Sequence, residues 1–170
     1  MRERPNVVLM TEQSDHEREQ ALADLAESAQ ERGVRIAVAE SLTSGRIASR
    51  IGAGEGAADW FAGGVVAYQM RTKERVLGVG HGLDPCSAEV AEQLAAGVRE
   101  LLGADLAVAA TGVGGPDPQD GHAPGTVYLG WADANGRGHV LFEFDGDPVS
   151  VMDQSVDAAV TLLHERLGLR

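Results

Sequence analysis

Apolar residues recur every three or four positions over residues 14–33, the first part of the chain with a clear period. This spacing predicts an amphipathic helix, because acidic residues and Arg fill the opposite side. A short apolar run with β-branched residues follows at 34–39 and predicts a buried strand, and helical spacing returns over 43–53. The members of the first apolar stripe are Ala21, Leu22, Leu25, Ala26 and Ala29.

Similar patterns continue toward the C-terminus. Ser87 is placed to cap a long helix, with Glu89 and Glu92 near its first turns. Asn135 and Gly136 stand between two apolar runs and are a strong hairpin signal. The remaining expected elements are strands over 61–68, 105–110, 125–132 and 139–144, helices over 71–79, 87–102 and 149–167, and a loop rich in Gly, Pro and Asp over 111–124.

This order of helices and strands predicts an α/β fold with helices on both faces of a mixed sheet. A chain of 170 residues is in the size range of one domain with one hydrophobic core. Residues 1–13 carry mixed charge without a period, so we expect a flexible lead-in there, followed by a single domain over 14–170.

The charge balance argues against polyanionic partners. Fourteen basic and 26 acidic residues give a formal net charge of −12, which repels nucleic acid and anionic membrane surfaces. Cys86 is the single cysteine, so no disulfide can form within the chain. No apolar run of about 20 residues occurs in the sequence. We therefore expect a cytoplasmic protein that binds a small molecule.

Candidate chemistry gathers where expected strands give way to helices, the usual place for ligands in open α/β sheets. The first such junction holds Ser41, the second holds Tyr68 and Lys73, and the third is the Gly-rich loop 111–117. Lys73 is the single Lys among 14 basic residues, and Lys, unlike Arg, can lose its proton when buried. A Ser beside a desolvated Lys is one way to activate a hydroxyl nucleophile, so the three junctions together can form a hydrolytic site.

Each signal also has an ordinary explanation. Thr43 and Ser44 are favoured helix caps whether or not a ligand binds, and a single leftover Lys can arise by chance. The Gly-rich loop has neither the Lys-Ser or Lys-Thr of a phosphate-binding P-loop nor the Rossmann spacing. The five His residues show no metal-ligand spacing, and Cys86 before a helix is more simply a structural residue than a reactive thiol.

Five separated segments carry a family resemblance. They are Ala-Glu-Ser-Leu-Thr-Ser-Gly at 39–45, Trp-Phe-Ala-Gly-Gly-Val-Val-Ala-Tyr at 60–68, Lys73 with Leu-Gly-Val at 77–79, Ala-Thr-Gly-Val-Gly-Gly-Pro-Asp at 110–117 and Pro-Gly-Thr-Val at 124–127. In this order and spacing they resemble the CinA C-terminal domain family, whose enzymatic members are nicotinamide-nucleotide amidases. The likeness runs from about residue 14 to 167.

The resemblance implies a three-layer α/β/α sandwich around a mixed, largely parallel sheet. It further implies hydrolysis of the carboxamide of nicotinamide mononucleotide to nicotinate mononucleotide and ammonia, without a metal or cofactor. Ser41 matches the family's nucleophile and Lys73 its base, with Tyr68 and Thr43 in support. Backbone N–H groups of the Gly-rich loop would hold the substrate or its oxyanion. The substrate-binding residues implied are Glu40, Thr43, Ser44, Gly45, Thr111, Gly112, Gly114, Gly115, Pro116, Asp117, Gly125 and Thr126.

The chain also departs from the family's pattern, and the losses include hydroxyl, amide and cationic groups. This leaves a second hypothesis, a catalytically degenerate module that binds a nucleotide or a protein in a competence or DNA-damage setting. The resemblance implies a homo-oligomer as well, for which the apolar stretches 61–68 and 142–144 are candidate interfaces. The departing residues are Ser44 for Gly, Ala57 and Ala58 for Ser, Met70 for Asn, Cys86 for Val and Pro148 for Arg.

Overall fold

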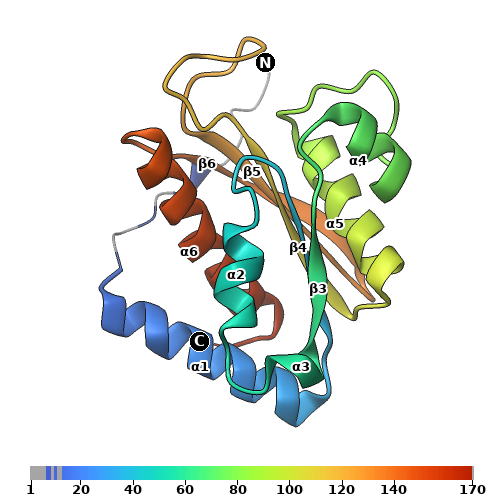
Figure 1. Cartoon of the computed structure of the whole chain (residues 1–170), viewed down its shortest axis with the longest axis vertical. Helices are drawn as coiled ribbons and strands as arrows, with labels where there is room; N and C mark the ends of the chain where they lie inside the picture. The colour runs from blue at the N-terminus through green and yellow to red at the C-terminus, as the bar shows by residue number, and fades with distance from the viewer. Residues whose placement is uncertain (1–6, 9, 11–12, 170) are drawn as a thin grey trace.

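The computed structural model describes residues 7–8, 10 and 13–169, and its centre is a six-stranded sheet in the order β1-β6-β5-β4-β2-β3 (Figure 1). Three of the five strand pairings are parallel, and only β5 runs against the other strands. The sheet is therefore mixed and largely parallel, as predicted. The strands are β1 (Val7–Val8), β2 (Ile36–Glu40), β3 (Phe61–Val66), β4 (Leu106–Gly112), β5 (Thr126–Asp133) and β6 (Gly136–Glu143).

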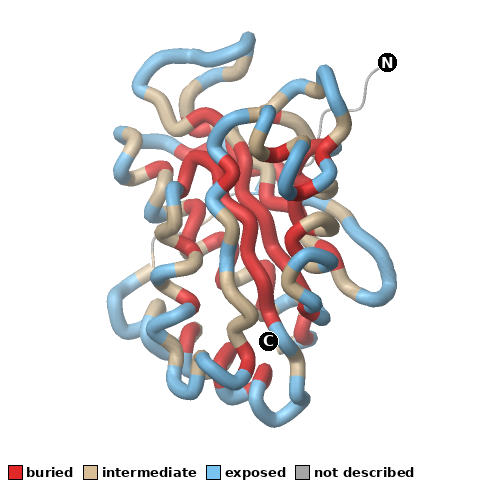
Figure 2. The backbone as a smooth tube through the Cα atoms, turned by 45° about the vertical axis from the view of Figure 1, so that its right-hand side comes forward, coloured by how far each residue is buried: buried red, intermediate tan, exposed pale blue. Residues whose placement is uncertain are grey.

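Helices cover both faces of this sheet and make a three-layer α/β/α sandwich (Figure 1). Side chains alternate along β2, so Ile36 and Val38 pack on one face and Ala37 and Ala39 on the other. Figure 2 shows the central strands as the most continuously buried part of the backbone. Helices α1 (Asp15–Arg32), α2 (Arg46–Gly52) and α6 (Pro148–Arg166) lie on the first face, and α4 (Met70–Leu77) and α5 (Ala88–Leu102) on the second.

The register of the parallel strands determines where the site lies. Glu40, the last residue of β2, is paired with Val66 of β3 and with Ala110 of β4. Consequently the segments that leave these three strands meet at the carboxyl end of the sheet. The N–H of Ala67 donates to the Glu40 carbonyl at 2.8 Å and extends the pairing past the end of β3.

The local signals read from the sequence are present at the helix ends. Ser14 forms a capping box with Glu17, and the Ser87 hydroxyl accepts the Val90 N–H at 3.3 Å. The hairpin joins β5 to β6 through Ala134 and Asn135, and Gly136 is the first residue of β6. Helix α2 begins later than expected, at Arg46 instead of residue 43, because 41–44 form a turn.

Two elements were not predicted from the pattern. Helix α3 (Ala57–Trp60) is a single turn, too short to show a helical period. Strand β1 lies within the lead-in expected over 1–13, most of which is outside the described residues, and pairs with β6. No helix among the described residues has the length and apolar character needed to cross a membrane.

Candidate active site

Ser41 follows β2 directly, at the carboxyl end of the sheet, where β2, β3 and β4 end. Its N–H donates to the Ala110 carbonyl at 3.1 Å, which fixes its backbone to β4. Its carbonyl accepts the Ser44 N–H at 3.1 Å, so the chain turns at once, and Ser44 and Gly45 complete the turn with φ angles of 48° and 99°. The side chain of Ser41 is thus held in a fixed, buried position at the carboxyl end of the sheet.

Lys73 lies in the first turn of α4 and is only 2% exposed. Helix α4 turns Lys73 and Leu77 to its buried face, since residues four apart share one side of a helix. The helix can approach α5 because position 97 is Gly, where a Cβ would collide with the Leu77 carbonyl. Tight packing of α4 on α5 therefore buries an amine that would otherwise reach water.

The two predicted catalytic groups meet. The Lys73 Nζ lies 3.0 Å from the Ser41 Oγ, in a buried hydrogen bond. Burial lowers the pKa of the Lys73 amine, because desolvation disfavours its charged form, while Cys86 acts in the opposite direction. A lysine with a lowered pKa is neutral over a wider range of pH and can accept the hydroxyl proton of Ser41.

A cavity of about 630 Å³ opens onto this pair. Ser41, Lys73 and Tyr68 line it together with six of the expected substrate-binding residues. Because the wall combines β2, β4, α4 and the Gly-rich loop, all three junctions singled out in the sequence contribute to one pocket. The six are Ser44, Thr111, Gly112, Gly114, Gly115 and Asp117.

The Gly-rich loop is shaped by close backbone contacts. Gly112 lies so near Thr126 that a Cβ would collide with the Thr126 carbonyl. The Val113 N–H donates to that same carbonyl at 2.9 Å, so this N–H is not available to a ligand. The N–H groups of Gly114 and Gly115 make no hydrogen bond to another described residue. These two are the better candidates for holding a developing oxyanion.

Glu40 is 1% exposed and does not line the pocket. Its carboxylate accepts the Ile47 N–H at 2.9 Å and the Ala48 N–H at 3.0 Å, which lie in the first turn of α2. Free N–H groups and the positive end of a helix attract such a carboxylate. Glu40 therefore holds the start of α2 and the turn at Ser41 in place, and it does not reach a substrate in the pocket.

Several other expected binding residues also lie outside the pocket wall. Thr43 is fully buried, and its hydroxyl has no hydrogen-bond partner among the described residues. Gly125 lies against Phe144, so a Cβ at position 125 would collide with the Phe144 carbonyl. The Thr126 carbonyl already accepts the Val113 N–H. Gly45 and Pro116 complete the set that the pocket wall does not include.

Tyr68 lines the pocket but is 66% exposed. Its phenol makes no hydrogen bond to Ser41, Lys73 or any other described residue. The structure therefore places Tyr68 at the rim of the pocket, in reach of a ligand but not of the Ser41–Lys73 pair. The catalytic role expected for Tyr68 stays a prediction.

Cys86 lies near the Ser41–Lys73 pair, although its position before a helix was only a weak signal for a reactive thiol. It is buried, lines the pocket, and its Sγ lies 3.8 Å from the Thr126 carbonyl. Burial raises the pKa of the Cys86 thiol to about 11, with a further contribution from Asp84. A thiol with this pKa is neutral near pH 7 and is a poor nucleophile.

The departures from the family's pattern fall in two places. Met70, Cys86, Pro148 and Ser44 all line the pocket. By contrast, Ala57 and Ala58 lie in α3, which precedes β3 and so is at the opposite end of the sheet from Ser41 (Figure 1). The absent hydroxyls at 57 and 58 therefore do not remove groups from this pocket.

The pocket also contains residues that no sequence signal indicated. Met152, from the first turns of α6, closes one side of it beside Pro148, which the family pattern had already singled out. Gln119 and Asp120 come from the tip of the loop after β4. Their approach depends on how α6 and the loop pack, which periodicity does not reveal. Among the described residues, no three His, Cys, Asp or Glu side chains are placed to hold a metal ion.

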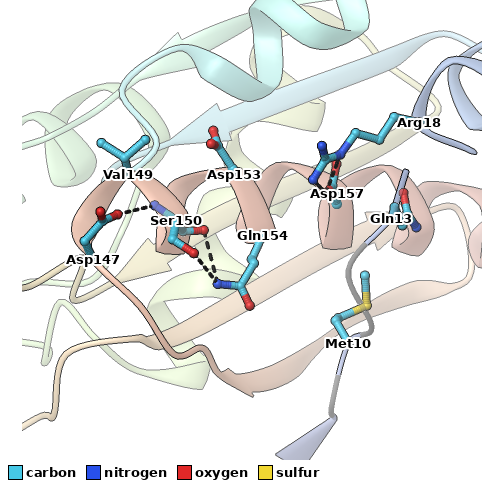
Figure 3. Close-up of a pocket in the computed structure, with 9 residues that line it drawn as sticks. All are labelled: Met10, Gln13, Arg18, Asp147, Val149, Ser150, Asp153, Gln154 and Asp157. Atoms are coloured by element: carbon cyan, nitrogen blue, oxygen red, sulfur yellow. Dashed lines mark hydrogen bonds and ion pairs between the residues drawn. The ribbon is translucent and has the colours of Figure 1, made fainter. Parts of the chain in front are cut away.

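A second hollow, of about 410 Å³, lies along α6 (Figure 3). Its carboxylates already have partners within the chain. Asp157 forms an ion pair with Arg18 at 2.8 Å, Asp153 bonds Arg46 at 2.6 Å, and Asp147 accepts the Ser150 N–H at the start of α6. This hollow therefore has a structural explanation, and the pocket at Ser41 is the candidate active site.

Comparison with known proteins assigns the chain to a family. Residues 18–167 match the family model described as the CinA C-terminal domain. A CinA-like protein of Geobacter sulfurreducens is 38% identical over 172 residues, covering 98% of this chain and 41% of that protein. A CinA-like protein of Frankia casuarinae is 37% identical over 142 residues, covering 81% of this chain and 33% of the relative. The chain thus spans less than half the length of these curated relatives.

Solved structures show the same fold. A competence-damaged protein (CinA) superfamily protein of Klebsiella pneumoniae superposes with a TM-score of 0.84 at 29% identity, covering 89% of this chain and 98% of that one. A protein of the same superfamily from Escherichia coli gives a TM-score of 0.84 at 28% identity, covering 90% of this chain and 92% of that one.

Proposed function

Because this chain belongs to the CinA C-terminal domain family, we propose that it is an amidohydrolase that acts on the carboxamide of nicotinamide mononucleotide. The products are nicotinate mononucleotide and ammonia. The observation that carries the proposal is the buried 3.0 Å hydrogen bond between Lys73 Nζ and Ser41 Oγ at the floor of a ligand-sized pocket.

In the first half of the reaction, the neutral Lys73 amine takes the proton of the Ser41 hydroxyl while Oγ attacks the carboxamide carbon. The carbonyl oxygen becomes an oxyanion, for which the N–H groups of Gly114 and Gly115 are available donors. The Lys73 ammonium then returns its proton to the amide nitrogen, and ammonia leaves. Ser41 is left as an ester of the nicotinate group.

In the second half, a water molecule replaces ammonia. Lys73, neutral again, takes a proton from the water, whose oxygen attacks the ester carbon. Collapse of the second tetrahedral intermediate releases the nicotinate product and restores the Ser41 hydroxyl with the proton from Lys73. One lysine thus serves as base and acid in both halves, which requires that its pKa lie nearer to neutrality than that of an exposed lysine.

A catalytically inactive binding module is the second candidate. Met70 and Pro148 favour it, because both line the pocket with apolar groups where the family pattern has an amide and a cation. Such a module would bind the nucleotide without releasing ammonia.

Ammonia release from nicotinamide mononucleotide distinguishes the two candidates. We expect turnover by the wild type and a fall of about 10³-fold or more in Ser41→Ala and Lys73→Met. Ser49→Ala and Arg75→Met, on the exposed sides of α2 and α4, are matched controls that should retain activity. Nucleotide binding measured by calorimetry without any ammonia release by the folded wild type would favour the binding module.

The expected homo-oligomer also stays a proposal. Strand β3 is an edge strand of the sheet; Val66 at its end is 48% exposed, and Tyr68 just after it is 66% exposed. The other stretch expected at an interface is not available, since Phe142 and Phe144 are buried and stack with ring centroids 5.1 Å apart. A second copy would therefore meet the β3 edge.

A further inference from the structure

The loop between β4 and β5, residues 113–125, is tied to the sheet at its base. There the Val113 N–H donates to the Thr126 carbonyl at 2.9 Å, and the Gly125 N–H donates to the Val113 carbonyl at 2.8 Å. Beyond this base, residues 114–121 make no hydrogen bond to any described residue outside the loop. The loop stands out past the carboxyl end of the sheet (Figure 1), and several of its residues line the pocket.

The tip of the loop is a rigid two-residue turn. The Gln119 N–H donates to the His122 carbonyl at 3.1 Å, and the His122 N–H donates to the Gln119 carbonyl at 2.9 Å. Asp120 and Gly121 between them have φ angles of 50° and 83°, as a narrow hairpin turn of type I′ requires. Gln119 and Asp120 line the pocket, so the position of His122 determines where this part of the wall lies.

The side chain of His122 ties this tip to the rest of the chain. Its Nε2 lies 2.7 Å from Oδ2 of Asp84, in the segment that precedes α5. Because an ionised carboxylate only accepts hydrogen bonds, His122 is the donor, and it can donate from Nε2 whether its ring is neutral or protonated. Within the described residues, this is the hydrogen bond that joins 114–122 to a segment outside the loop.

Asp84 is in turn fixed to the body of the protein. Its other carboxylate oxygen accepts the Cys86 N–H at 3.0 Å, and its carbonyl accepts the Ser87 hydroxyl at 2.7 Å. The Ser87 hydroxyl also caps α5, and the neighbouring Pro85 carbonyl accepts the Thr111 hydroxyl at 2.7 Å. One side-chain pair thus connects the loop tip to a segment that is anchored on both α5 and β4.

This pair matters more to the pocket than to the stability of the fold. The side chains of His122 and Asp84 are 25% and 45% exposed, and ion pairs so close to water add little to the free energy of unfolding. The free N–H groups of Gly114 and Gly115, however, lie in the same loop, between its base and its tip. Donors to an oxyanion lose much of their effect when they are displaced by about 1 Å.

We infer that Asp84 and His122 are positioning residues, which hold the loop where its Gly114 and Gly115 N–H groups can stabilise the oxyanion. Neither side chain lines the pocket, so both act through the loop and not on the substrate. The inference rests on the proposed amide hydrolysis at Ser41.

The first test is a double-mutant cycle on ammonia release from nicotinamide mononucleotide. We expect kcat to fall about 10- to 100-fold in His122→Ala and in Asp84→Ala, with KM changed by less than about threefold, because the displaced donors act on the transition state. The double variant should be about as slow as either single variant, since each removes the same hydrogen bond. His122→Gln, whose amide N–H can take the place of Nε2, should recover most of the loss.

The matched control is the pair of His139 and Glu92, whose ring nitrogen and carboxylate oxygen are also 2.7 Å apart but which does not line the pocket. His139→Ala and Glu92→Ala should keep kcat within about threefold of the wild type. An unchanged kcat in both His122→Ala and Asp84→Ala would overturn the inference, and so would losses that multiply in the double variant.

The second test separates this inference from the choice of substrate. A small fluorophosphonate places its phosphoryl oxygen where the oxyanion would form, so its rate of attachment to Ser41 depends on the same donors. Slower labelling in both His122→Ala and Asp84→Ala, with no ammonia release by the wild type, would leave the inference standing and reject the nucleotide as substrate. Labelling at the wild-type rate in both variants would overturn the inference whatever the activity, and so would a wild type that neither releases ammonia nor is labelled at Ser41.

Discussion

At the scale of single residues, Lys73 links the stability of the fold to its chemistry. Its amine is 2% exposed, and its one side-chain hydrogen bond within the described chain goes to Ser41. Taking a charged amine out of water is unfavourable, so burial lowers the pKa of Lys73 and favours its neutral form. The same shift makes the amine useful as a base.

Replacement of Lys73 by Met should therefore increase stability while abolishing activity. The unfolded chain binds a proton at Lys73 up to about pH 10.5, whereas the folded chain loses it at lower pH. The contribution of Lys73 to the free energy of unfolding is lowest below the folded-state pKa. It rises as the pH increases from that pKa to the unfolded-state value of about 10.5. We expect Lys73→Met to exceed the wild type in free energy of unfolding at neutral pH, with a difference that narrows toward pH 10.5. Urea unfolding at several pH values measures this, and a variant less stable at every pH would contradict it.

The pH dependence of activity follows from the same group. Because the neutral amine is the base, kcat/KM should rise with pH through the lowered pKa of Lys73 and level off below 10.5. Lys73→Arg keeps the positive charge but cannot lose its proton, so its activity should fall about 10³-fold. Ammonia release between pH 5 and 10 provides the profile. An arginine variant with near wild-type activity would show that the charge of Lys73 matters and its basicity does not.

Cys86 offers a check on which nucleophile acts. With a pKa raised to about 11, its thiol is almost entirely protonated at pH 8. We expect Cys86→Ala to retain kcat within about threefold of the wild type, since the variant removes only one pocket contact. Steady-state ammonia release from this variant and from Ser41→Ala shows whether Ser41 or Cys86 is the nucleophile. Loss of activity on removal of the thiol, with Ser41→Ala still active, would transfer the nucleophile to Cys86.

At the scale of elements, the site depends on how β2, α2 and α4 are joined. The carboxylate of Glu40 bonds the first N–H groups of α2 and so fixes the turn that carries Ser41. Removing a buried acceptor leaves these N–H groups without a partner.

Glu40→Ala should lower the free energy of unfolding by about 2 to 4 kcal/mol. It should also reduce kcat more than it raises KM, because the Ser41 turn loosens while the pocket wall at Gly112–Gly115 is unaffected. Glu40→Gln keeps one acceptor and should lie between the alanine variant and the wild type. Urea unfolding and steady-state kinetics measure both effects, and an alanine variant of wild-type stability would refute the assigned role of Glu40.

Much of the element order could be predicted from the sequence, because each signal was local. The period of apolar residues located α1 and α5, and the cap at Ser87 has the predicted hydrogen bond. The direction of Glu40 could not be predicted, since a carboxylate at a strand end can point to a ligand or to the next helix. Met152 lines the pocket because of the packing of α6, which depends on the whole fold. Thus Ser41 and Lys73 were predictable from motif and chemistry, whereas the pocket wall opposite them was not.

At the scale of the whole molecule, the net charge of −12 acts on any ligand that approaches. The phosphate of the mononucleotide should be repelled at long range by this net charge. Raising the salt concentration from about 10 mM to 200 mM shortens the Debye length from about 30 Å to below 10 Å. We therefore expect kcat/KM for the mononucleotide to rise severalfold with salt. Initial rates at fixed pH test this, and a fall for the mononucleotide would indicate an attractive site for its phosphate.

The most direct test of Ser41 as a nucleophile activated by Lys73 is covalent labelling with a small fluorophosphonate, followed by peptide mapping. This reagent attacks activated serine hydroxyls and does not require the true substrate. We expect stoichiometric modification of Ser41 in the wild type, none at the nearby Ser44, and labelling slowed by about 100-fold or more in Lys73→Met. An unmodified Ser41, or equal labelling of Ser41 with and without Lys73, would contradict the activation of Ser41 by Lys73.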